Sequence, residues 1–285
     1  MVSTVPQKWR ELFKLLPGYD PIATAGDCAF DARTADLVCE FFPDQMTHIE
    51  GQFAGKPFEL QPWQQALLGC AFGWMRPNGL RRYREVFQYV PRKNGKTTQM
   101  GGMINLVAFC DDEPGAQIYS AAADREQAAL VFRQTKGMIL NRPELESQTQ
   151  IYATYKSICY PNNIVYKALS AEAESKHGYN SHFVCIDELH AQPNRDLVDV
   201  LLTSTGSRRQ PLVWYITTAD FDRESICNEK HNYASKVRDG IIEDNSFLPC
   251  IFEASIDDDW ESPAIWRKAN PNLGVSISEE YLARE

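Results

Sequence analysis

The strongest chemical signal in the sequence is the segment 89–98, which reads Tyr-Val-Pro-Arg-Lys-Asn-Gly-Lys-Thr-Thr. It follows an apolar strand candidate at 86–90 and precedes a helix candidate at 96–109. A strand, a tight loop ending in Gly-Lys-Thr and a helix form the layout of a phosphate-binding loop, whose amides and helix N-terminus favour a triphosphate. Lys96 would then reach the β- and γ-phosphates, and the Thr97 hydroxyl would bind the bridging Mg²⁺.

One position departs from the usual phosphate loop. The common pattern has a glycine five residues before Gly95, and Val90 stands there instead. Gly-Lys-Thr alone is common by chance, and a basic turn between a strand and a helix is the alternative interpretation. The phosphate-site hypothesis therefore needs partners elsewhere in the chain.

The required partner is the segment 183–188, which reads Phe-Val-Cys-Ile-Asp-Glu. An apolar run ending in a carboxylate predicts a buried strand with Asp187 at its C-terminal edge, where α/β sheets bind ligands. Asp187 would hold Mg²⁺ through its water shell, and Glu188 would polarise the attacking water as a general base. Taken alone, this acid pair could equally cap a following helix. Together with Gly95-Lys96-Thr97, it predicts ATP hydrolysis.

Composition sets limits on the class of protein. The chain has 285 residues, 44% of them hydrophobic, which is enough for one large α/β domain or two small ones. It contains neither a run as long as a membrane helix nor an apolar signal-peptide core near its start, so no membrane partner is expected. Eight cysteines without a Cys-x-x-Cys pair favour reduced thiols in a cytoplasmic protein.

The net charge of −9 excludes a surface that is basic throughout. Charge is unevenly spread, however, because residues 76–96 hold seven basic residues and one acid. A nucleic-acid partner would have to meet a local basic face of this kind, although a solvated basic surface is the alternative.

Strand and helix candidates alternate along the chain. Strands are expected at 86–90, 116–121, 164–169, 183–186, 212–217 and 247–252. Helices are expected at about 9–16, at 31–42 with Pro43 ending it, from Pro62 to Trp74, and at 96–109, 124–140, 196–203 and 224–238. Continuously apolar strands that alternate with helices predict an α/β fold with a mostly parallel central sheet flanked by helices.

Three regions are expected from these elements. Residues 1–57 form an N-terminal helical extension, and residues 58–254 form the ATPase core with the phosphate loop. Residues 255–285 are acidic and carry Asn270-Pro271-Asn272, so they predict an exposed linker subdomain rather than core.

In order and content, these segments resemble the ATPase half of the large terminase subunit of tailed double-stranded DNA bacteriophages. The matching segments are Pro62-Trp63-Gln64, 91–97, 187–190, 217–219, 169–172 with Gly178, and 266–274. An Arg-Lys-x-Gly-Lys-Thr loop without the first glycine is typical of that family, so the departure at Val90 supports the resemblance. The resemblance implies a P-loop NTPase fold of the ASCE type, with ATP and Mg²⁺ as cofactors.

The resemblance also implies roles for individual residues. Gln64 resembles the glutamine that reads adenine, with Trp63 packed nearby or simply in the core. Arg92 resembles a loop arginine that senses the γ-phosphate or acts as an arginine finger in cis, unless it is an ordinary surface arginine. The whole ATP-binding set would be Trp63, Gln64, Arg92, Lys93, Asn94, Gly95, Lys96, Thr97 and Thr98.

Thr217 and Thr218 resemble the family's coupling motif, in which hydroxyl groups change partners after hydrolysis. Threonines that bond to the backbone at a strand end are the alternative. Such motors act as rings, so the resemblance also implies an arginine supplied in trans, and the candidates are Arg125, Arg208 and Arg209.

The implied partners are double-stranded DNA, a portal protein, a small terminase subunit and further copies of the chain in a ring, pentameric by resemblance. The implied location is the host cytoplasm and, transiently, the portal vertex of a procapsid, and the isolated domain is expected to be monomeric. The loop 175–181, with Lys176, is a candidate for DNA contact or else an ordinary surface loop.

Family members also carry a C-terminal nuclease of the RNase H type. The consecutive acids 257–259 cannot converge on one metal, so we expect this chain to hydrolyse ATP without cutting DNA. His177, His182 and His190 with Cys185 match no zinc pattern.

Two other functions remain open from sequence alone. A superfamily 2 helicase is one, because 187–190 resembles a helicase box and Gln64 a Q motif, although the chain has no room for a second RecA-like domain. A phosphate-loop module that binds nucleotide as a non-catalytic switch is the other.

Overall fold

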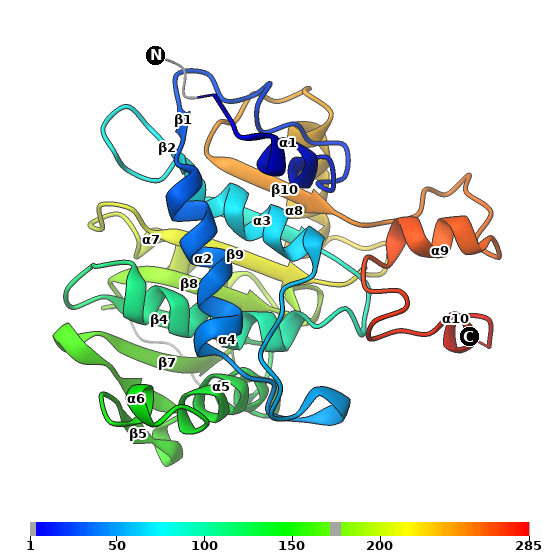
Figure 1. Ribbon diagram of the computed structural model, residues 1–285. Coiled ribbons are helices and arrows are strands. Elements are labelled where there is room, and N and C mark those ends of the chain that lie inside the picture. The colour runs from blue at the N-terminus through cyan, green and yellow to red at the C-terminus, as the bar shows by residue number, and fades with distance from the viewer. Residues whose placement is uncertain (1–3, 172–177, 285) are drawn as a thin grey trace.

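The computed structural model describes residues 4–171 and 178–284. Its centre is an eight-stranded sheet in the order β10-β3-β9-β8-β4-β7-β6-β5 (Figure 1). The strands are β3 Glu85–Tyr89, β4 Gln117–Ala122, β5 Gln150–Tyr152, β6 Ser157–Cys159, β7 Val165–Ser170, β8 Ser181–Asp187, β9 Leu212–Thr217 and β10 Phe247–Ile251. All neighbouring pairs from β10 to β7 are parallel, which confirms the predicted α/β fold.

The antiparallel strands β5 and β6 at one edge were not expected from the sequence. Each has three residues, and most of these are partly or fully exposed, so neither strand produces a continuous apolar run. By contrast, every residue of β8, β9 and β10 is buried, which is why their apolar runs are visible in the sequence.

Helices cover both faces of the sheet. The helices are α1 Gln7–Phe13, α2 Ala32–Gln45, α3 Pro62–Gly73, α4 Lys96–Cys110, α5 Arg125–Leu140, α6 Pro143–Glu146, α7 Asp196–Thr203, α8 Ile226–Arg238, α9 Pro263–Ala269 and α10 Glu279–Leu282. Short 3₁₀ turns lie at η1 Gly51–Phe53, η2 Ala153–Tyr155, η3 Pro161–Asn163 and η4 Leu189–Ala191. Residues of α1 to α5 share one hydrophobic cluster, whereas α7 and α8 pack into a second cluster on the other face.

Two predicted helix ends are wrong. Helix α2 passes through Pro43 and ends at Gln45, because a proline in the last turn removes only one backbone donor and the Met46 N–H still closes the end on the Phe42 carbonyl at 2.8 Å. Helix α3 stops at Gly73, and Trp74 instead enters β2 (Trp74–Met75), which pairs with β1 (Ala29–Phe30).

The N-terminal helices belong to the same core as the sheet. Trp9 of α1 and Phe42 of α2 lie in the first hydrophobic cluster together with Ile104 of α4. The Trp9 ring lies so close to Gly69 of α3 that a Cβ at position 69 would come within 2.0 Å of it. The extension is therefore packed against the core rather than tethered to it.

The C-terminal region divides into an exposed part and a buried part. Helices α9 and α10 project from the main body in Figure 1, and every residue of α9 is at least partly exposed. The segment 270–277 turns back, however, and Asn270, Asn272 and Ile277 are buried. The expectation of an exposed region was therefore wrong for this segment, because buried asparagines leave no apolar pattern in the sequence.

No helix in the described part of the chain is both long and apolar enough to span a membrane.

Candidate nucleotide site

Three strand ends meet at one edge of the sheet. Strand β9 lies between β3 and β8, with Tyr89 opposite Thr217 and Ile216 opposite Asp187. The strands are parallel, so their carboxyl ends lie at the same level. This register brings the phosphate loop, the acid pair and the two threonines to the same edge, where α/β sheets bind ligands.

The conformation of the phosphate loop shows why no glycine is needed at position 90. The Val90 side chain is fully buried, and its N–H donates to the Thr217 carbonyl at 3.1 Å, so Val90 continues the pairing of β3 with β9. The left-handed residues of the loop are Lys93, with φ 69°, and Gly95, with φ 77°. Gly95 is also the N-cap of α4, which points the helix N-terminus at the loop.

A cavity of about 450 Å³ opens beside the loop. It is lined by Glu50, Arg92, Lys93, Gly95, Lys96, Thr97, Thr98, Leu130, Arg133, Gln134 and Glu188. The structure thus brings most of the predicted loop residues and Glu188 to one space. Sequence reasoning missed the α5 side of this cavity, because an arginine on an exposed helix face, such as Arg133, carries no local signal.

Lys96 is buried against its own loop. Its Nζ donates to the carbonyls of Val90 at 3.3 Å and Pro91 at 3.4 Å, and lies 3.7 Å from Glu188 Oε1. Burial lowers the pKa of Lys96, and the nearby Glu188 and Asp187 partly oppose that shift. A phosphate in place of Glu188 would supply the countercharge to the Lys96 ammonium.

Asp187 has an unsatisfied oxygen. It is 3% exposed, and Oδ1 has no hydrogen-bond partner within the described parts of the chain. Burial, followed by the neighbouring charge of Glu188, raises the pKa of Asp187 to about 7. The loop that carries the Thr97 hydroxyl begins at the same edge of the sheet. A carboxylate oxygen without a partner and a hydroxyl are hard oxygen ligands, of which Mg²⁺ takes only a few from a protein.

Glu188 is held in an uncommon conformation. Its backbone is left-handed, with φ 48°, in the turn between β8 and η4. Burial would raise the pKa of Glu188, but contact with His190, followed by the charges of Lys96 and Arg92, holds that pKa below its usual value. The carboxylate is therefore ionised at neutral pH, as a general base must be.

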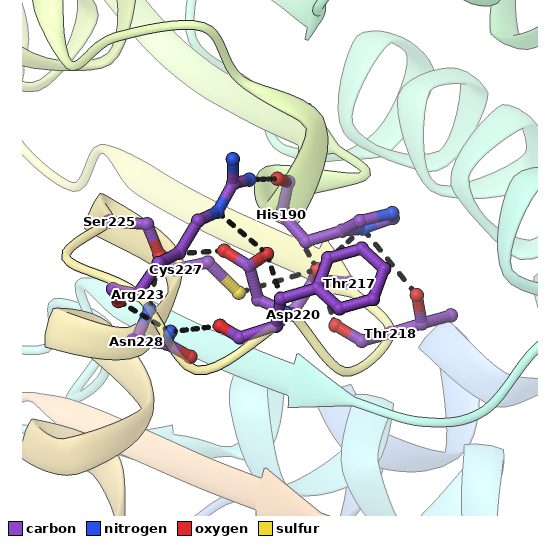
Figure 2. Close-up of polar contacts among 9 residues, drawn as sticks. His190, Thr217, Thr218, Asp220, Arg223, Ser225, Cys227 and Asn228 are labelled. Carbon is purple, nitrogen blue, oxygen red and sulfur yellow. Dashed lines mark hydrogen bonds and ion pairs between the residues drawn. The ribbon is translucent and has the colours of Figure 1, made fainter.

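The two threonines lie beside His190 (Figure 2), and His190 in turn contacts Glu188. The His190 N–H donates to Thr217 Oγ1 at 3.1 Å, and His190 Nδ1 lies 3.3 Å from Thr217 Oγ1 and 3.4 Å from Thr218 Oγ1. The same Nδ1 is 3.2 Å from Glu188 Oε2. The sequence placed His190 in the family-matching segment 187–190 and weighed it as a metal ligand, but assigned it no contact with Glu188 or with the threonines.

A second set of contacts fixes the loop that follows β9 (Figure 2). Arg223 donates to the His190 carbonyl at 2.8 Å and to Asp220 Oδ1 at 3.1 Å, and the Ser225 hydroxyl donates to Asp220 Oδ2 at 2.7 Å. The turn that carries His190 is thereby tied to the start of α8.

Gln64 and Trp63 do not lie in the cavity. Gln64 is buried, its Oε1 accepts from the Gln61 N–H at 2.9 Å, and its Nε2 donates to Gln99 Oε1 at 3.2 Å. It caps α3 and bonds to α4, so its amide is occupied inside the protein. Trp63 is also buried and donates to Asn272 Oδ1 at 2.6 Å.

The three candidate trans arginines lie at opposite edges of the sheet. Arg208 precedes β9, and its guanidinium donates to the carbonyls of Asn180 at 3.2 Å and Gly115 at 2.7 Å, so it joins loops at the N-terminal edge. Arg209 is in the same loop. Arg125, in contrast, is exposed at the start of α5, just beyond the C-terminal end of β4, on the side of the cavity. Lys176 and His177 lie outside the described residues.

Comparison with known proteins gives a consistent result. A family model described as "Terminase large subunit, ATPase domain" matches residues 62–236. The chain is 30% identical over 242 residues to the "Terminase, large subunit" of Enterobacteria phage HK97, covering 83% of this chain and 46% of the relative. It is 36% identical over 105 residues to "Protein YmfN" of Escherichia coli (strain K12), covering 37% of this chain and 23% of that protein.

A solved structure agrees with these sequence matches. The crystal structure of the HK97 bacteriophage large terminase superposes with a TM-score of 0.77 at 27% identity, covering 88% of this chain and 50% of that one. The chain therefore spans about half the length of its HK97 relative, as both the 46% and the 50% coverage indicate.

Proposed function

This chain belongs to the family of terminase large subunit ATPase domains, and from that premise we propose that it hydrolyses ATP to move double-stranded DNA into a procapsid. The observation that carries the proposal is the shared cavity. Lys96 lies 3.7 Å from Glu188 there, and Arg92 lines the same space. Asp187, whose Oδ1 has no partner among the described residues, ends the strand beside it.

Nucleotide binding would change the partner of Lys96. When nucleotide binds, its ammonium would leave Glu188 and the two loop carbonyls for the β- and γ-phosphates, while the loop amides receive the remaining oxygens. The released Glu188 could then orient the attacking water and accept its proton. Arg92 would offset the negative charge that develops on the transferred group.

Thr97 and Asp187 would hold Mg²⁺, Thr97 through its hydroxyl and Asp187 through its unpartnered oxygen. Mg²⁺ held by these two residues would supply positive charge that offsets part of the negative charge of the phosphates. Asp187 would be fully ionised in that state, because a nearby cation lowers the pKa of a carboxylate.

The contact of Glu188 with His190 supports a route for coupling. Loss of the γ-phosphate would move Glu188, and His190 would transmit that movement to Thr217 and Thr218. Among the candidate trans arginines, Arg125 is the one whose exposure and position support insertion into a neighbouring subunit's site. The partners of the motor would be DNA, a portal protein, a small terminase subunit and other copies of the chain in a ring, in the host cytoplasm at the portal vertex.

The decisive test is ATP turnover by Glu188→Gln, measured with and without double-stranded DNA. We expect turnover to fall at least about 100-fold, the usual contribution of a general base, while the dissociation constant for ADP stays within about threefold. Glu50→Gln is the matched control, because Glu50 is an exposed carboxylate that precedes η1 and lines the same cavity. This substitution should change turnover less than about threefold.

Two results would contradict the proposal. Equal turnover in Glu188→Gln and the parent, or none in the parent with DNA present, would favour the non-catalytic switch. Unwinding of a tailed duplex would favour the helicase.

A further inference from the structure

The C-terminal segment 270–276 is bonded to the back of the phosphate loop. Asn272 and Asn270 are 5% and 9% exposed, although the helices on either side of them are largely exposed. Two buried amides require partners, because an unsatisfied buried polar group costs about 1–3 kcal/mol. Both find partners in Asn94, at the centre of the loop.

The bonds run in both directions between the two segments. The Asn272 N–H donates to Asn94 Oδ1 at 3.0 Å, and Asn272 Nδ2 donates to the Asn94 carbonyl at 3.1 Å. Asn94 Nδ2 in turn donates to Asn270 Oδ1 at 3.3 Å. The side chain and the backbone of Asn94 are thus both fixed by residues about 180 positions later in the chain.

Further contacts surround this pair of segments. Asn272 Oδ1 accepts from Trp63 Nε1 at 2.6 Å, so Asn272 also bridges the loop to α3. The Ser276 hydroxyl donates to the Lys93 carbonyl at 2.5 Å. On the loop side, Asn94 Nδ2 also donates to the Pro91 carbonyl at 3.1 Å.

The loop needs support of this kind. Asn94 lies between the left-handed residues Lys93 and Gly95, and a left-handed conformation is unfavourable for a lysine. Both of these neighbours line the nucleotide cavity, whose lining includes neither Asn94 nor the segment 270–276. The orientation of the loop amides toward a phosphate is therefore set by contacts made on its far side.

We propose that Asn272 is a positioning residue, which holds the phosphate loop in the conformation that receives nucleotide and links that loop to the segment 270–276. The inference rests on the proposed function, because it assigns the loop a nucleotide. A link of this kind is reciprocal, so nucleotide binding should stabilise the docked segment as much as the docked segment favours nucleotide.

An isosteric pair of substitutions tests the proposal in the 285-residue chain. Asn272→Asp keeps the acceptor for Trp63 but removes the amide donor to the Asn94 carbonyl. Asn270→Asp places the same charge in the same segment but keeps the acceptor for Asn94, and loses only a bond to the Trp266 carbonyl. The pair therefore matches charge and shape, and differs in whether a donor to the loop is lost.

Two measurements are made on each variant: amide hydrogen exchange across residues 91–98 without nucleotide, and the dissociation constants for ADP and for AMP-PNP. We expect Asn272→Asp to speed loop exchange and to weaken both nucleotides about tenfold, the equivalent of about 1.4 kcal/mol, with saturating turnover within about threefold of the parent. Asn270→Asp should change each quantity less than about threefold. Asn272→Ala, which adds no charge, should follow Asn272→Asp.

The outcomes separate this proposal from the proposed function. Unchanged loop exchange and nucleotide affinity in Asn272→Asp and Asn272→Ala would overturn it, as would equal losses in Asn270→Asp. If the parent binds neither nucleotide, the proposed function fails, and the exchange of residues 91–98 alone then decides whether Asn272 positions the loop.

Discussion

Two aspartates at opposite edges of the sheet, the buried Asp187 and the partly buried Asp111, have opposite surroundings. Asp111, which caps α4 at the N-terminal edge, accepts from Arg81 Nη1 at 3.1 Å and Nη2 at 2.9 Å, and lies 2.5 Å from His182 Nε2. Asp187, at the C-terminal edge, has an oxygen without a partner among residues 4–171 and 178–284. Burial raises the pKa of Asp187 to about 7, whereas Arg81 and His182 outweigh burial and hold the pKa of Asp111 below its usual value.

The rest of each edge follows the same division. At the N-terminal edge the fully buried Arg82 donates to three backbone carbonyls, those of Pro21, Thr24 and Asn245. At the C-terminal edge Lys96 and Glu188 lie 3.7 Å apart and line a cavity. The carboxylate of Asp111 and the guanidinium of Arg82 at one edge are therefore bonded within the protein, whereas Asp187 at the other edge keeps bonding capacity for a ligand at a cost in stability.

The largest expected effect is that of Asp111→Asn. Removing this carboxylate leaves the buried guanidinium of Arg81 without its countercharge, so the free energy of unfolding should fall by about 3–5 kcal/mol. Urea unfolding measures the change, and ATP turnover per folded molecule should equal that of the parent. A decrease in the free energy of unfolding below about 1 kcal/mol would show that the ion pairs at this edge contribute little to stability.

Arg208→Ala and Arg125→Ala extend the comparison to the arginines. Arg208 bonds to two backbone carbonyls, so its loss should lower the free energy of unfolding by about 2 kcal/mol without changing turnover. The exposed Arg125 should have the reverse effect, with stability within about 0.5 kcal/mol of the parent and a lower turnover only at concentrations where subunits associate. Turnover lost in Arg208→Ala alone would move the trans role to the N-terminal edge.

Asp187→Asn should change stability less than Asp111→Asn does, and in the opposite direction. The substitution removes a buried charge beside Glu188, so the free energy of unfolding should stay constant or rise by up to about 1–2 kcal/mol. Turnover that depends on Mg²⁺ should be lost. A marked destabilisation would mean that Asp187 has structural partners after all, and the contrast between the two edges would fail.

The pH dependence of stability separates the same two carboxylates. Between about pH 4 and 7 the folded chain keeps a proton on Asp187 that the unfolded chain has released, so this group lowers stability as the pH rises, and the slope should vanish in Asp187→Asn. The contribution of Asp111 has the other sign. It is complete above the ordinary pKa of about 4 and is lost as the pH falls through the lower folded value, so the difference between the parent and Asp111→Asn should shrink only below about pH 4.

Several elements follow from the sequence because their cause is local. Helix α7 and strand β9 have the predicted bounds, 196–203 and 212–217, and Asp124 caps α5 by accepting from two backbone amides, as expected from its type and position. The short strands β5 and β6 could not be predicted, because β6 forms by pairing with β7 and β5 by pairing with β6, and neither has an apolar pattern of its own.

The residues of the site likewise include some whose position could be predicted from the sequence and some whose position could not. Gly95, Lys96 and Thr97 on one strand end and Asp187-Glu188 on another could be predicted to meet, because parallel strands place their carboxyl ends together. Their spacing could not show that the Gln64 amide is occupied by Gln61 and Gln99, which became clear only from the packing of α3 on α4.

The sequence by itself determined the class of fold, the phosphate loop and the acids opposite it, since strand, helix and loop preferences act over a few residues. Only the tertiary structure decided which polar groups are satisfied and which are left for a ligand. It showed that Asn272 bonds to Asn94, that His190 contacts both Glu188 and Thr217, and that the Val90 N–H donates to the Thr217 carbonyl. Those are long-range contacts, and a buried hydrogen bond between distant polar residues leaves no periodic pattern along the chain.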